Sequence, residues 1–431
     1  MTISRIAVVN RGAAAVRVIH AVRERALELD ADLRTIAFYS DEDRGSLFVR
    51  EADERYPIGP ATVAVPGSEH RLSAYLSLPV MQEALVRSGA DAAWVGWGYN
   101  AENAEFATMC DDLGITFIGA PADVLRRLRD TINAKRLAEG VGIPVARWSG
   151  GSVDSVDTAR VEAARLGYPV MIKAAAGSGG RGVYDVGREE DLASAFAQAR
   201  DRARALFGDP TVYLEAAVPG ARQVEVQLAA DRAGTVWALG VRDSSVQRGH
   251  RKIFDEAPSP MLTVEQDAWA CDAAIRFARE AGFQGMGSVE FLSDTATGRL
   301  LFLEFNARLQ AAHPVTEVTT GLDLVELALH LADGGLLQGE PPVSHGHAIA
   351  ARLLAEDPDH EFAASPGRIE LLRFPGGPGL RVDAAVEEGD PMPSVFEPVL
   401  ATVVAHGQDR TEAIARLRRA LAESSVLLEG G

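Results

Sequence analysis

Glu304 and Asn306 lie two residues apart in a short apolar run, and this spacing marks the first candidate site in the chain. In a strand, side chains two apart share a face, so Glu304, Asn306 and Arg308 are predicted to point one way and Leu303 and Phe305 the other. Carboxylate and amide oxygens are ligands that Mg²⁺ uses when a phosphate completes its coordination. The pattern predicts a magnesium and phosphate site, although a solvated sheet edge has the same spacing.

Glu290, in the apolar run at residues 287–292, offers a third oxygen ligand. Residues 294–298 read Asp-Thr-Ala-Thr-Gly, which is typical of a tight turn between two antiparallel strands. A hairpin here would bring Glu290 to the same site as Glu304.

Lys173 ends a predicted strand, residues 170–173, and a glycine-rich loop at residues 176–182 follows it. The backbone N–H groups of such a hairpin can lie over phosphates, and the loop can open and close as a lid. Lys173 would then neutralise the charge of an α- or β-phosphate. The order differs from a P-loop, in which the lysine follows the glycines and a helix comes next. A flexible turn would have the same composition.

Residues 242–252 gather hydrogen-bond donors beside an acid, in the order Arg-Asp-Ser-Ser-Val-Gln-Arg-Gly-His-Arg-Lys. This segment follows the strand predicted at residues 236–241. Its donors suit an anion that is bound or formed, and a basic surface loop is the alternative.

The composition describes an ordinary globular protein of two or three domains, with 431 residues, 47% hydrophobic and 24% charged. The net charge of -18 argues against a nucleic-acid or anionic-membrane partner, because both require clustered Lys and Arg. Two cysteines, Cys110 and Cys271, fall in helix-like apolar patterns, and no secretory or membrane-spanning run is present. We therefore expect a cytoplasmic chain with buried, reduced thiols.

The first predicted elements of the chain are strands at residues 5–9, 35–39, 92–95 and 115–118, with helices between them. This alternation predicts a doubly wound parallel sheet. The loop after the first strand holds one glycine and lacks the dinucleotide fingerprint, so we predict no nicotinamide site. Residues 96–103, at the carboxyl end of the third strand, lie where ligands approach such sheets, or form an aromatic packing loop.

Further along, the pattern alternates between strands and long helices. Helices are predicted at residues 156–166, 189–206, 264–281 and 411–423, and strands at residues 183–186, 212–215, 224–228, 346–352 and 399–405.

The order of these parts resembles the ATP-grasp superfamily and, within it, the biotin carboxylase family. The resemblance runs from Arg5 to about Leu421 and rests on short matching segments, such as Val-Asn-Arg-Gly at residues 9–12, Gly-Tyr-Pro-Val-Met-Ile-Lys-Ala at 167–174, His-Pro-Val-Thr-Glu at 313–317 and Ala-Glu-Asp-Pro at 355–358. Residues 94–103 and 148–151 resemble the large multidomain acyl-CoA carboxylases more than the free-standing bacterial subunit.

This resemblance implies an α/β chain with an ATP-grasp fold. A doubly wound N-terminal domain would span residues 1–120. The ATP-grasp domain would span residues 121–340, with a glycine-hairpin lid at about 145–217. A C-terminal α+β domain would span residues 341–431.

The implied reaction uses MgATP to phosphorylate bicarbonate to carboxyphosphate, which delivers CO₂ to N1 of biotin. No Met-Lys-Met biotinylation motif is present, so biotin would sit on a separate carrier domain. A carboxyltransferase domain or subunit is an implied partner, and a homodimer an implied assembly.

Residue roles follow from position in the resemblance. ATP would be bound by Lys173, Gly177, Gly179, Gly180, Gly182, Glu215, Val218, Gln247 and His250. Mg²⁺, or Mn²⁺ in its place, would be bound by Glu290, Glu304 and Asn306. Lys252 would steady the phosphoryl group, Arg308 with Gln310 and the Ala311 backbone would hold bicarbonate, and Arg352 would stabilise the enolate-like biotin.

Several positions depart from the family pattern. Ala312 replaces the glutamate that deprotonates bicarbonate, and a missing general base typically costs about 10²–10⁴ in rate. Other departures are Ala13 for Glu, Thr131 for a phosphate-facing Lys, Gln223 for His, Gly249 for Arg, Arg251 for Gln and Thr402 for Lys. The alternatives to a biotin carboxylase are an ATP-grasp ligase for another carboxylate or amine, and a non-catalytic relative kept for assembly.

Overall fold

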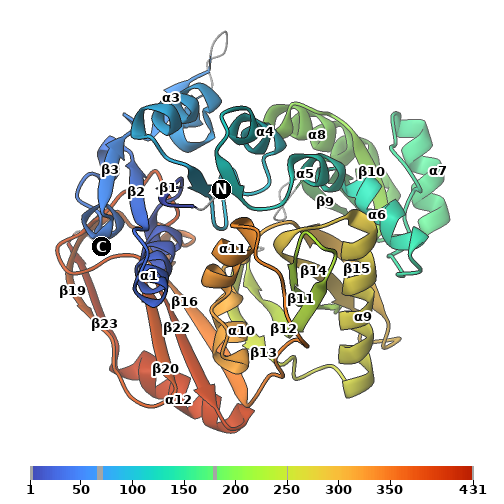
Figure 1. The fold of residues 1–431 in the computed structure, drawn as a ribbon. Coiled ribbons are helices and arrows are strands. Elements are labelled where there is room, and N and C mark those ends of the chain that lie inside the picture. Colours follow the sequence, from blue (N-terminus) through green and yellow to red (C-terminus); the bar gives the residue numbers. More distant parts are fainter. Residues whose placement is uncertain (1–2, 66–70, 178–181, 250, 430–431) are drawn as a thin grey trace.

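The computed structural model describes residues 3–65, 71–177, 182–249 and 251–429. In Figure 1 the N-terminal elements (blue) and the C-terminal elements (red) lie next to each other on the left, where helix α1 (Gly12–Leu29) packs on strands β20 (Leu380–Ala384) and β22 (Val399–Gly407). The glycine positions 179 and 180, and His250, lie outside the described residues.

The N-terminal part is built on a parallel sheet of five strands in the order β3-β2-β1-β6-β7. Its strands are β1 (Arg5–Val8), β2 (Arg34–Tyr39), β3 (Glu54–Pro57), β6 (Ala92–Trp94) and β7 (Thr116–Ile118). Helix α1 packs on one face, and α3 (Leu78–Ser88) and α4 (Ala104–Asp112) pack on the other. Strands covered on both faces are apolar without alternation, which is why β1 and β2 read as continuous hydrophobic runs. The predicted doubly wound sheet is confirmed.

Short elements complete this part and connect it to the next. They are α2 (Leu47–Glu51), β4 (Thr62–Ala64), β5 (Arg71–Ser73), α5 (Ala122–Arg129) and α6 (Thr131–Gly140).

The predicted lid is a separate antiparallel sheet of three strands in the order β10-β8-β9. The strands are β8 (Val170–Ala174), β9 (Val183–Val186) and β10 (Val212–Ala216), and the helices α7 (Val156–Leu166) and α8 (Glu189–Phe207) pack on them around one apolar core. These bounds agree with the sequence-based prediction to within one residue at each end. Strand, glycine loop and strand form a hairpin, with Lys173 paired to Val183.

The largest sheet has eight strands in the order β15-β14-β11-β12-β13-β16-β22-β20. Its strands beyond β20 and β22 are β11 (Arg222–Ala230), β12 (Val236–Arg248), β13 (Arg251–Ala257), β14 (Gly285–Ser293), β15 (Leu300–Asn306) and β16 (His347–Leu354). Helix α9 (Val264–Ala281) packs on β11 and β12, and α10 (His313–Thr320) packs on β12, β13 and β16. Because β13 pairs with β16, the C-terminal strands continue the sheet that carries the central ones.

The strand predicted at residues 236–241 is longer than expected, because residues 242–248 form the second half of β12, and Arg251 and Lys252 begin β13. Arg242, Asp243 and Ser244 are buried among polar residues of the neighbouring strands, with Arg242 opposite Glu225, whereas Gln247 and Lys252, opposite each other further along, are half-buried. A strand with polar residues on its inner face shows no apolar alternation, which is why the pattern failed here.

The predicted hairpin between β14 and β15 is confirmed, with residues 294–298 at its turn. The prediction for Leu303 is wrong. A bulge leaves Leu303 outside the pairing between Glu290–Glu304 and Phe291–Phe302. Phe302 and Phe305 both stack on Phe277 in the core, whereas Leu303 is only half-buried and lines the cleft described below.

The remaining C-terminal elements surround the end of the large sheet. They are α11 (Leu324–Ala332), β17 (Glu356–Asp357), β18 (Ala363–Ala364), β19 (Gly367–Arg373), β21 (Pro391–Met392), α12 (Arg410–Glu423) and β23 (Ser425–Glu429). Helix α12 packs on β22 and β16.

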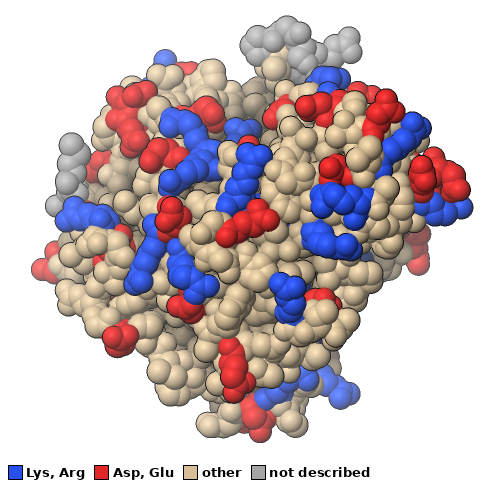
Figure 2. Space-filling model, turned by 90° about the vertical axis from the view of Figure 1, so that its right-hand side faces the viewer, with Lys and Arg blue, Asp and Glu red and all other residues tan. Residues whose placement is uncertain are grey.

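Basic and acidic side chains are interspersed on the face shown in Figure 2. Of the helices in the described ranges, none is both long and apolar enough to cross a bilayer. Cys110 is buried as predicted, whereas Cys271 is only half-buried.

Candidate active site

One cleft of about 1700 Å³ gathers most of the predicted site residues. Its walls come from the lid, the large sheet, the loop after β6 and the C-terminal strands. The predicted residues on these walls are Lys173, Gly177, Val218, Gln247, Lys252, Glu290, Glu304, Asn306, Arg308, Gln310, Ala311 and Arg352. Glu215 lies behind the wall, 1% exposed, and Gly182 is at the base of the lid hairpin.

The three predicted metal ligands are adjacent. Glu290 on β14 is directly opposite Glu304 on β15. The Asn306 amide nitrogen is 3.1 Å from Glu290 Oε1 and 3.4 Å from Glu304 Oε1. Adjacent strands with a local hairpin turn therefore bring two carboxylates and an amide to one place.

Lys252 lies between two of the buried glutamates. Its Nζ is 3.0 Å from Glu225 Oε2 and 2.9 Å from Glu290 Oε1. Burial opposes the charged form, but Glu225 and Glu290 raise the pKa of Lys252, so the side chain remains a cation. Arg242, 2.9 Å from Glu225 Oε1, holds the other oxygen of that carboxylate.

Glu290 is the most crowded carboxylate of the site. Lys252, Asn306, Gln310 and Gln223 all donate to it. Burial raises the pKa of Glu290, and although Lys252 lowers it, the nearby Glu304 raises it further. A cation beside these carboxylates would stabilise their charged forms.

This donor set fits Mg²⁺. In the part of the chain that the structure describes, no three His, Cys, Asp or Glu side chains form a metal cage. Mg²⁺ commonly takes only one or two protein carboxylates and completes its shell with waters and substrate phosphates. Glu290, Glu304 and Asn306 on the wall of a wide cleft match that pattern.

Arg308 is held by three neighbours. Its guanidinium donates to Asn306 Oδ1 at 3.0 Å and to Gln310 Oε1 at 3.1 Å, and its Nε is 3.3 Å from Glu102 Oε2. Glu102 also accepts from the Ala307 backbone N–H at 3.1 Å. The sequence did not single out Glu102, but it did single out its loop, residues 96–103, as a ligand-facing one. A fixed guanidinium edge in a cleft suits a small oxyanion.

The backbone turns into α10 directly after Gln310. Ala312 is 1% exposed and is the residue before that helix, so no acid stands at this position. His313 packs against Trp97, with ring centroids 4.8 Å apart. Glu317 is 3.7 Å from His313 and is paired with Arg17 and Arg381, so its carboxylate is committed elsewhere.

Arg352 enters the cleft from β16. Its guanidinium is 3.2 Å from Asp255 Oδ2, and the other Asp255 oxygen accepts from Ser244 at 2.6 Å. The C-terminal strands thus contribute a second fixed cation to the same cleft.

The lid side of the cleft has its own cation cluster. Lys173 Nζ is 2.9 Å from Glu215 Oε1, and Lys135 on α6 pairs with the other Glu215 oxygen. The sequence-based prediction missed Lys135. A signal was present, because Lys135 interrupts the buried face formed by Ile132, Ala134 and Ala138.

Gln247 and Gln223 link the two sides. Gln247 donates to Gln223 Oε1 at 2.7 Å, and Gln223 donates to Glu290. Gln223, which departs from the expected His, therefore still connects the predicted ribose contact to the metal ligands.

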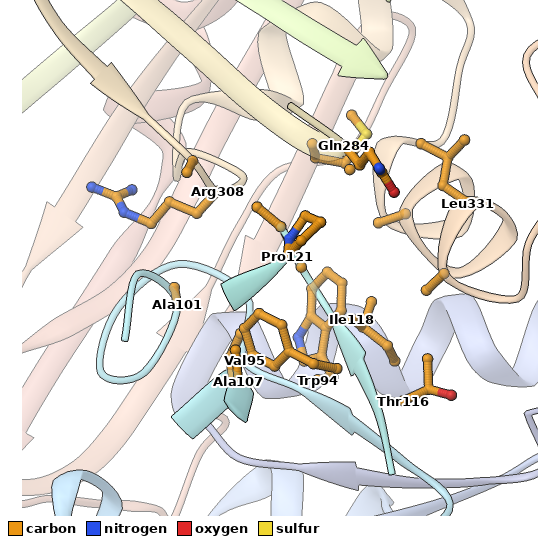
Figure 3. Close-up of a pocket in the computed structure, with 18 of the residues that line it drawn as sticks. Trp94, Val95, Ala101, Ala107, Thr116, Ile118, Pro121, Gln284, Arg308 and Leu331 are labelled. Carbon is orange, nitrogen blue, oxygen red and sulfur yellow. The ribbon is translucent and has the colours of Figure 1, made fainter. Parts of the chain in front are cut away.

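A smaller pocket of about 470 Å³ lies behind Arg308, between the carboxyl ends of β6 and β7 and helix α11. Figure 3 shows Trp94, Ile118 and Leu331 in its wall and the Arg308 guanidinium directed away from them. Its wall holds none of the predicted ATP or metal ligands, so the chemistry belongs to the large cleft.

Comparison with known families agrees with this geometry. Residues 2–125 match the biotin carboxylase N-terminal domain, residues 130–339 the ATP-binding domain of the carbamoyl-phosphate synthase L chain, and residues 350–427 the biotin carboxylase C-terminal domain. The chain is 38% identical to biotin carboxylase 1 of Bacillus subtilis over 99% of its own length and 92% of that protein. It belongs to the biotin carboxylase family. The ATP-grasp fold inferred from the resemblance is thereby confirmed.

Other members of the biotin carboxylase family are similarly close. The biotin carboxylase of Pseudomonas aeruginosa is 38% identical over 98% of this chain and 91% of that protein. A crystal structure of the biotin carboxylase β,γ-ATP complex from Campylobacter jejuni matches with a TM-score of 0.92 and 33% identity, covering 99% of this chain and 92% of that one. The biotin carboxylase domain dimer of the Hydrogenobacter thermophilus 2-oxoglutarate carboxylase, solved with MgADP and bicarbonate, matches with a TM-score of 0.92 and 33% identity, covering 99% and 91%.

Proposed function

We propose that this chain is an ATP- and Mg²⁺-dependent biotin carboxylase, or the biotin carboxylase domain of an acyl-CoA carboxylase. It transfers the terminal phosphoryl group of ATP to bicarbonate, giving ADP and carboxyphosphate. Carboxyphosphate breaks down to CO₂ and inorganic phosphate, the phosphate takes the N1 proton of carrier-bound biotin, and N1 then bonds to CO₂. The observation that carries this proposal is the presence in one cleft of a lid lysine, a two-carboxylate and amide cluster, and two fixed arginines.

The roles of the residues follow from charge and contact. Lys173 faces the cleft from the lid and would bind the ATP phosphates, while Glu215 and Val218 would line the adenine side. Lys252, held beside Glu290, would bind the phosphoryl group as it moves. Phosphoryl transfer depends on positioning and on charge stabilisation rather than on covalent chemistry by the protein.

Glu290, Glu304 and Asn306 would hold Mg²⁺, or Mn²⁺, which when bound neutralises charge on the β- and γ-phosphates. We assign bicarbonate to the guanidinium of Arg308, the side chain of Gln310 and the Ala311 backbone. Glu102 orients Arg308 through its contact with Nε. Arg352 would stabilise the enolate-like ureido oxygen of biotin.

We further propose an organisation into units at residues 1–120, 121–340 and 341–431, with the lid at about 145–217. Biotin on a separate carrier domain and a carboxyltransferase domain or subunit would be the partners, in the cytoplasm. A homodimer is the proposed assembly. The dimer named for the Hydrogenobacter thermophilus domain supports that arrangement.

The test is ADP release from MgATP with bicarbonate and free biotin, together with transfer of labelled carbon from bicarbonate to biotin. We expect both signals, at a rate reduced by the absence of an acid at position 312. ADP release without label transfer to biotin would overturn the proposal.

One observation favours a second candidate, an ATP-grasp ligase for another carboxylate or amine. The nucleotide side of the cleft keeps Lys173 and Gln247 on its wall, whereas Ala312 leaves the bicarbonate side without its base. A screen of carboxylate and amine acceptors would then reveal one that stimulates ADP release more than bicarbonate does. A non-catalytic assembly role predicts no nucleotide turnover under any of these conditions.

A further inference from the structure

Lysine is very rare in this chain and is confined to one place. Of the 43 Lys and Arg residues, only Lys135, Lys173 and Lys252 are lysines, so every other basic position is an arginine. Lys173 and Lys252 line the cleft, and Lys135 shares Glu215 with Lys173. Two of the three have proposed roles in the reaction, and Lys135 has none so far.

The surroundings of Lys135 are those of an interior residue. The side chain is 0% exposed and lies beside the rings of Trp148 and Tyr213, with Nζ 5.9 Å from each centroid. Its ammonium pairs with one oxygen of Glu215, whose other oxygen is 2.9 Å from Lys173. Burial lowers the pKa of Lys135, while Glu215 opposes the lowering.

Two ammonium groups share one buried carboxylate, and Glu139, the other acid that acts on Lys135, is exposed to solvent, so the buried cluster itself has a surplus of positive charge. Burying an ion pair is often no better for stability than burying apolar side chains of the same volume, so folding alone does not account for this arrangement. A surplus cation beside a cleft is favoured when an anion occupies the cleft. Lys173 connects the cluster to the cleft surface, where the phosphates of a nucleotide are proposed to lie.

The position of Lys135 on its helix points to the same ligand. Thr131 lies on the cleft wall where the family pattern has a phosphate-facing lysine. Lys135 follows it by four residues on α6, so the two side chains lie on one face of the helix, one turn apart. A positive charge missing at position 131 is therefore present one turn further along.

We propose that Lys135 is a positioning residue of the nucleotide site, which holds Glu215 so that Lys173 is directed at the phosphates and supplies the charge that Thr131 lacks. This inference rests on the proposed use of a nucleoside triphosphate. It does not depend on bicarbonate or biotin being the other substrates.

The test compares Lys135→Met, Thr131→Lys and the double variant by calorimetric titration with MgADP. We expect Lys135→Met to raise the Kd about tenfold, as for the loss of one charge-assisted contact, and the double variant to recover most of that loss. In turnover, Lys135→Met should raise the KM for ATP and leave the KM for bicarbonate unchanged. Arg136→Met, which removes an exposed cation from the same helix, is the matched control.

A purely structural role makes a different prediction. Lys135→Met would then lower the melting temperature without changing the Kd of the folded fraction, and Thr131→Lys would not compensate. Either result would overturn the inference. If Lys135→Met fails to fold, the double variant Lys135→Met with Glu215→Gln removes both buried charges. Its affinity for MgADP is then compared with that of Glu215→Gln alone. Equal affinities would overturn the inference as well.

The outcomes of these experiments distinguish a failure of this inference from a failure of the proposed function. Wild-type protein that binds MgADP but carboxylates no biotin would contradict the proposed function and leave the Lys135 comparison intact. Wild-type protein that does not bind MgADP would contradict both.

Discussion

The lid region and the Arg308 region of the cleft differ in how their charges are arranged. Beside the lid, Glu215 holds Lys135 and Lys173 together, so this region carries more positive than negative charge. Around Arg308, the positive charge of the guanidinium is already balanced by the nearby Glu102 and Glu304. Position 312, where the family pattern has a glutamate, is a buried alanine. The first region is suited to binding a polyanion, whereas the second can bind a small anion but has no free base. We therefore expect that mutations can affect nucleotide binding and bicarbonate activation separately.

The largest expected effect is a gain at the Arg308 region. Ala312→Glu supplies the carboxylate that the family pattern has there, and it should raise bicarbonate-dependent ADP release about 10²–10⁴-fold, the range typical of a general base. MgADP affinity should not change, because the lid region is untouched. Ala312→Gln, of similar size but unable to accept a proton, is the control. Equal rates for the two variants would favour the second candidate function.

Glu290→Gln should have the next largest effect, because Glu290 serves both regions. Lys252, Asn306 and Gln310 all donate hydrogen bonds to this carboxylate. A neutral amide in its place cannot balance the charge of Lys252 or of a bound Mg²⁺. We expect kcat for ADP release to fall about 10²–10³-fold. Initial rates measured across a Mg²⁺ titration check this. Glu280→Gln, on the exposed face of α9, should leave the rate unchanged. A Glu290→Gln rate near that of the wild type would contradict the assignment of the metal site.

Glu102→Gln should affect only the Arg308 region. The contact between Glu102 and Arg308 Nε would lose its charge, and the guanidinium would be held less firmly. We expect the KM for bicarbonate to rise about tenfold while the KM for ATP stays constant. Glu105→Gln, in the first turn of α4 and paired with Arg129, is the matched control. A change in the KM for ATP of the same size would show that the two regions are coupled.

The smallest effect at neutral pH concerns His313, which is next to Ala312. Burial lowers the pKa of His313 to about 3, while Asp383 opposes this change and Arg17 adds to it. A histidine in the unfolded chain has a pKa of about 6.5. At a pH between the folded and the unfolded pKa, the unfolded chain therefore binds more protons than the folded one. The free energy of unfolding should therefore decrease as the pH falls from about 6.5, by up to about 1.4 kcal/mol per pH unit.

Urea denaturation at pH 7 and pH 5 measures this dependence. His313→Gln should be less stable than the wild type at pH 7 and should lose stability less steeply on acidification. His20→Gln, at an exposed position, should keep the wild-type slope. If the free energy of unfolding of His313→Gln depended on pH as steeply as that of the wild type, other groups would be the cause of the acid sensitivity.

Features that depend on neighbours in the chain were predictable from sequence. The β14–β15 hairpin places Glu290 opposite Glu304 through a short turn, and the strand, glycine loop and strand of the lid follow the same logic. Alternating strands and helices likewise indicated the parallel N-terminal sheet. Periodicity failed where it was interrupted, at the bulge that turns Leu303 to the cleft and in the polar half of β12, where the predicted strand ended at residue 241. The assignments of ATP contacts to Gly179, Gly180 and His250 remain predictions.

The order of the elements, the polar face of the β14–β15 hairpin, and the departures at Thr131 and Ala312 can therefore be read from the chain alone. Which charges meet depends on the folded structure. Glu102 reaches the Arg308 segment from 205 residues away, and Lys135 meets Glu215 across the boundary between a connecting helix and the lid. Such pairs leave no periodic trace, because the energy of a buried charge depends on the partner that folding places beside it and not on its neighbours along the chain.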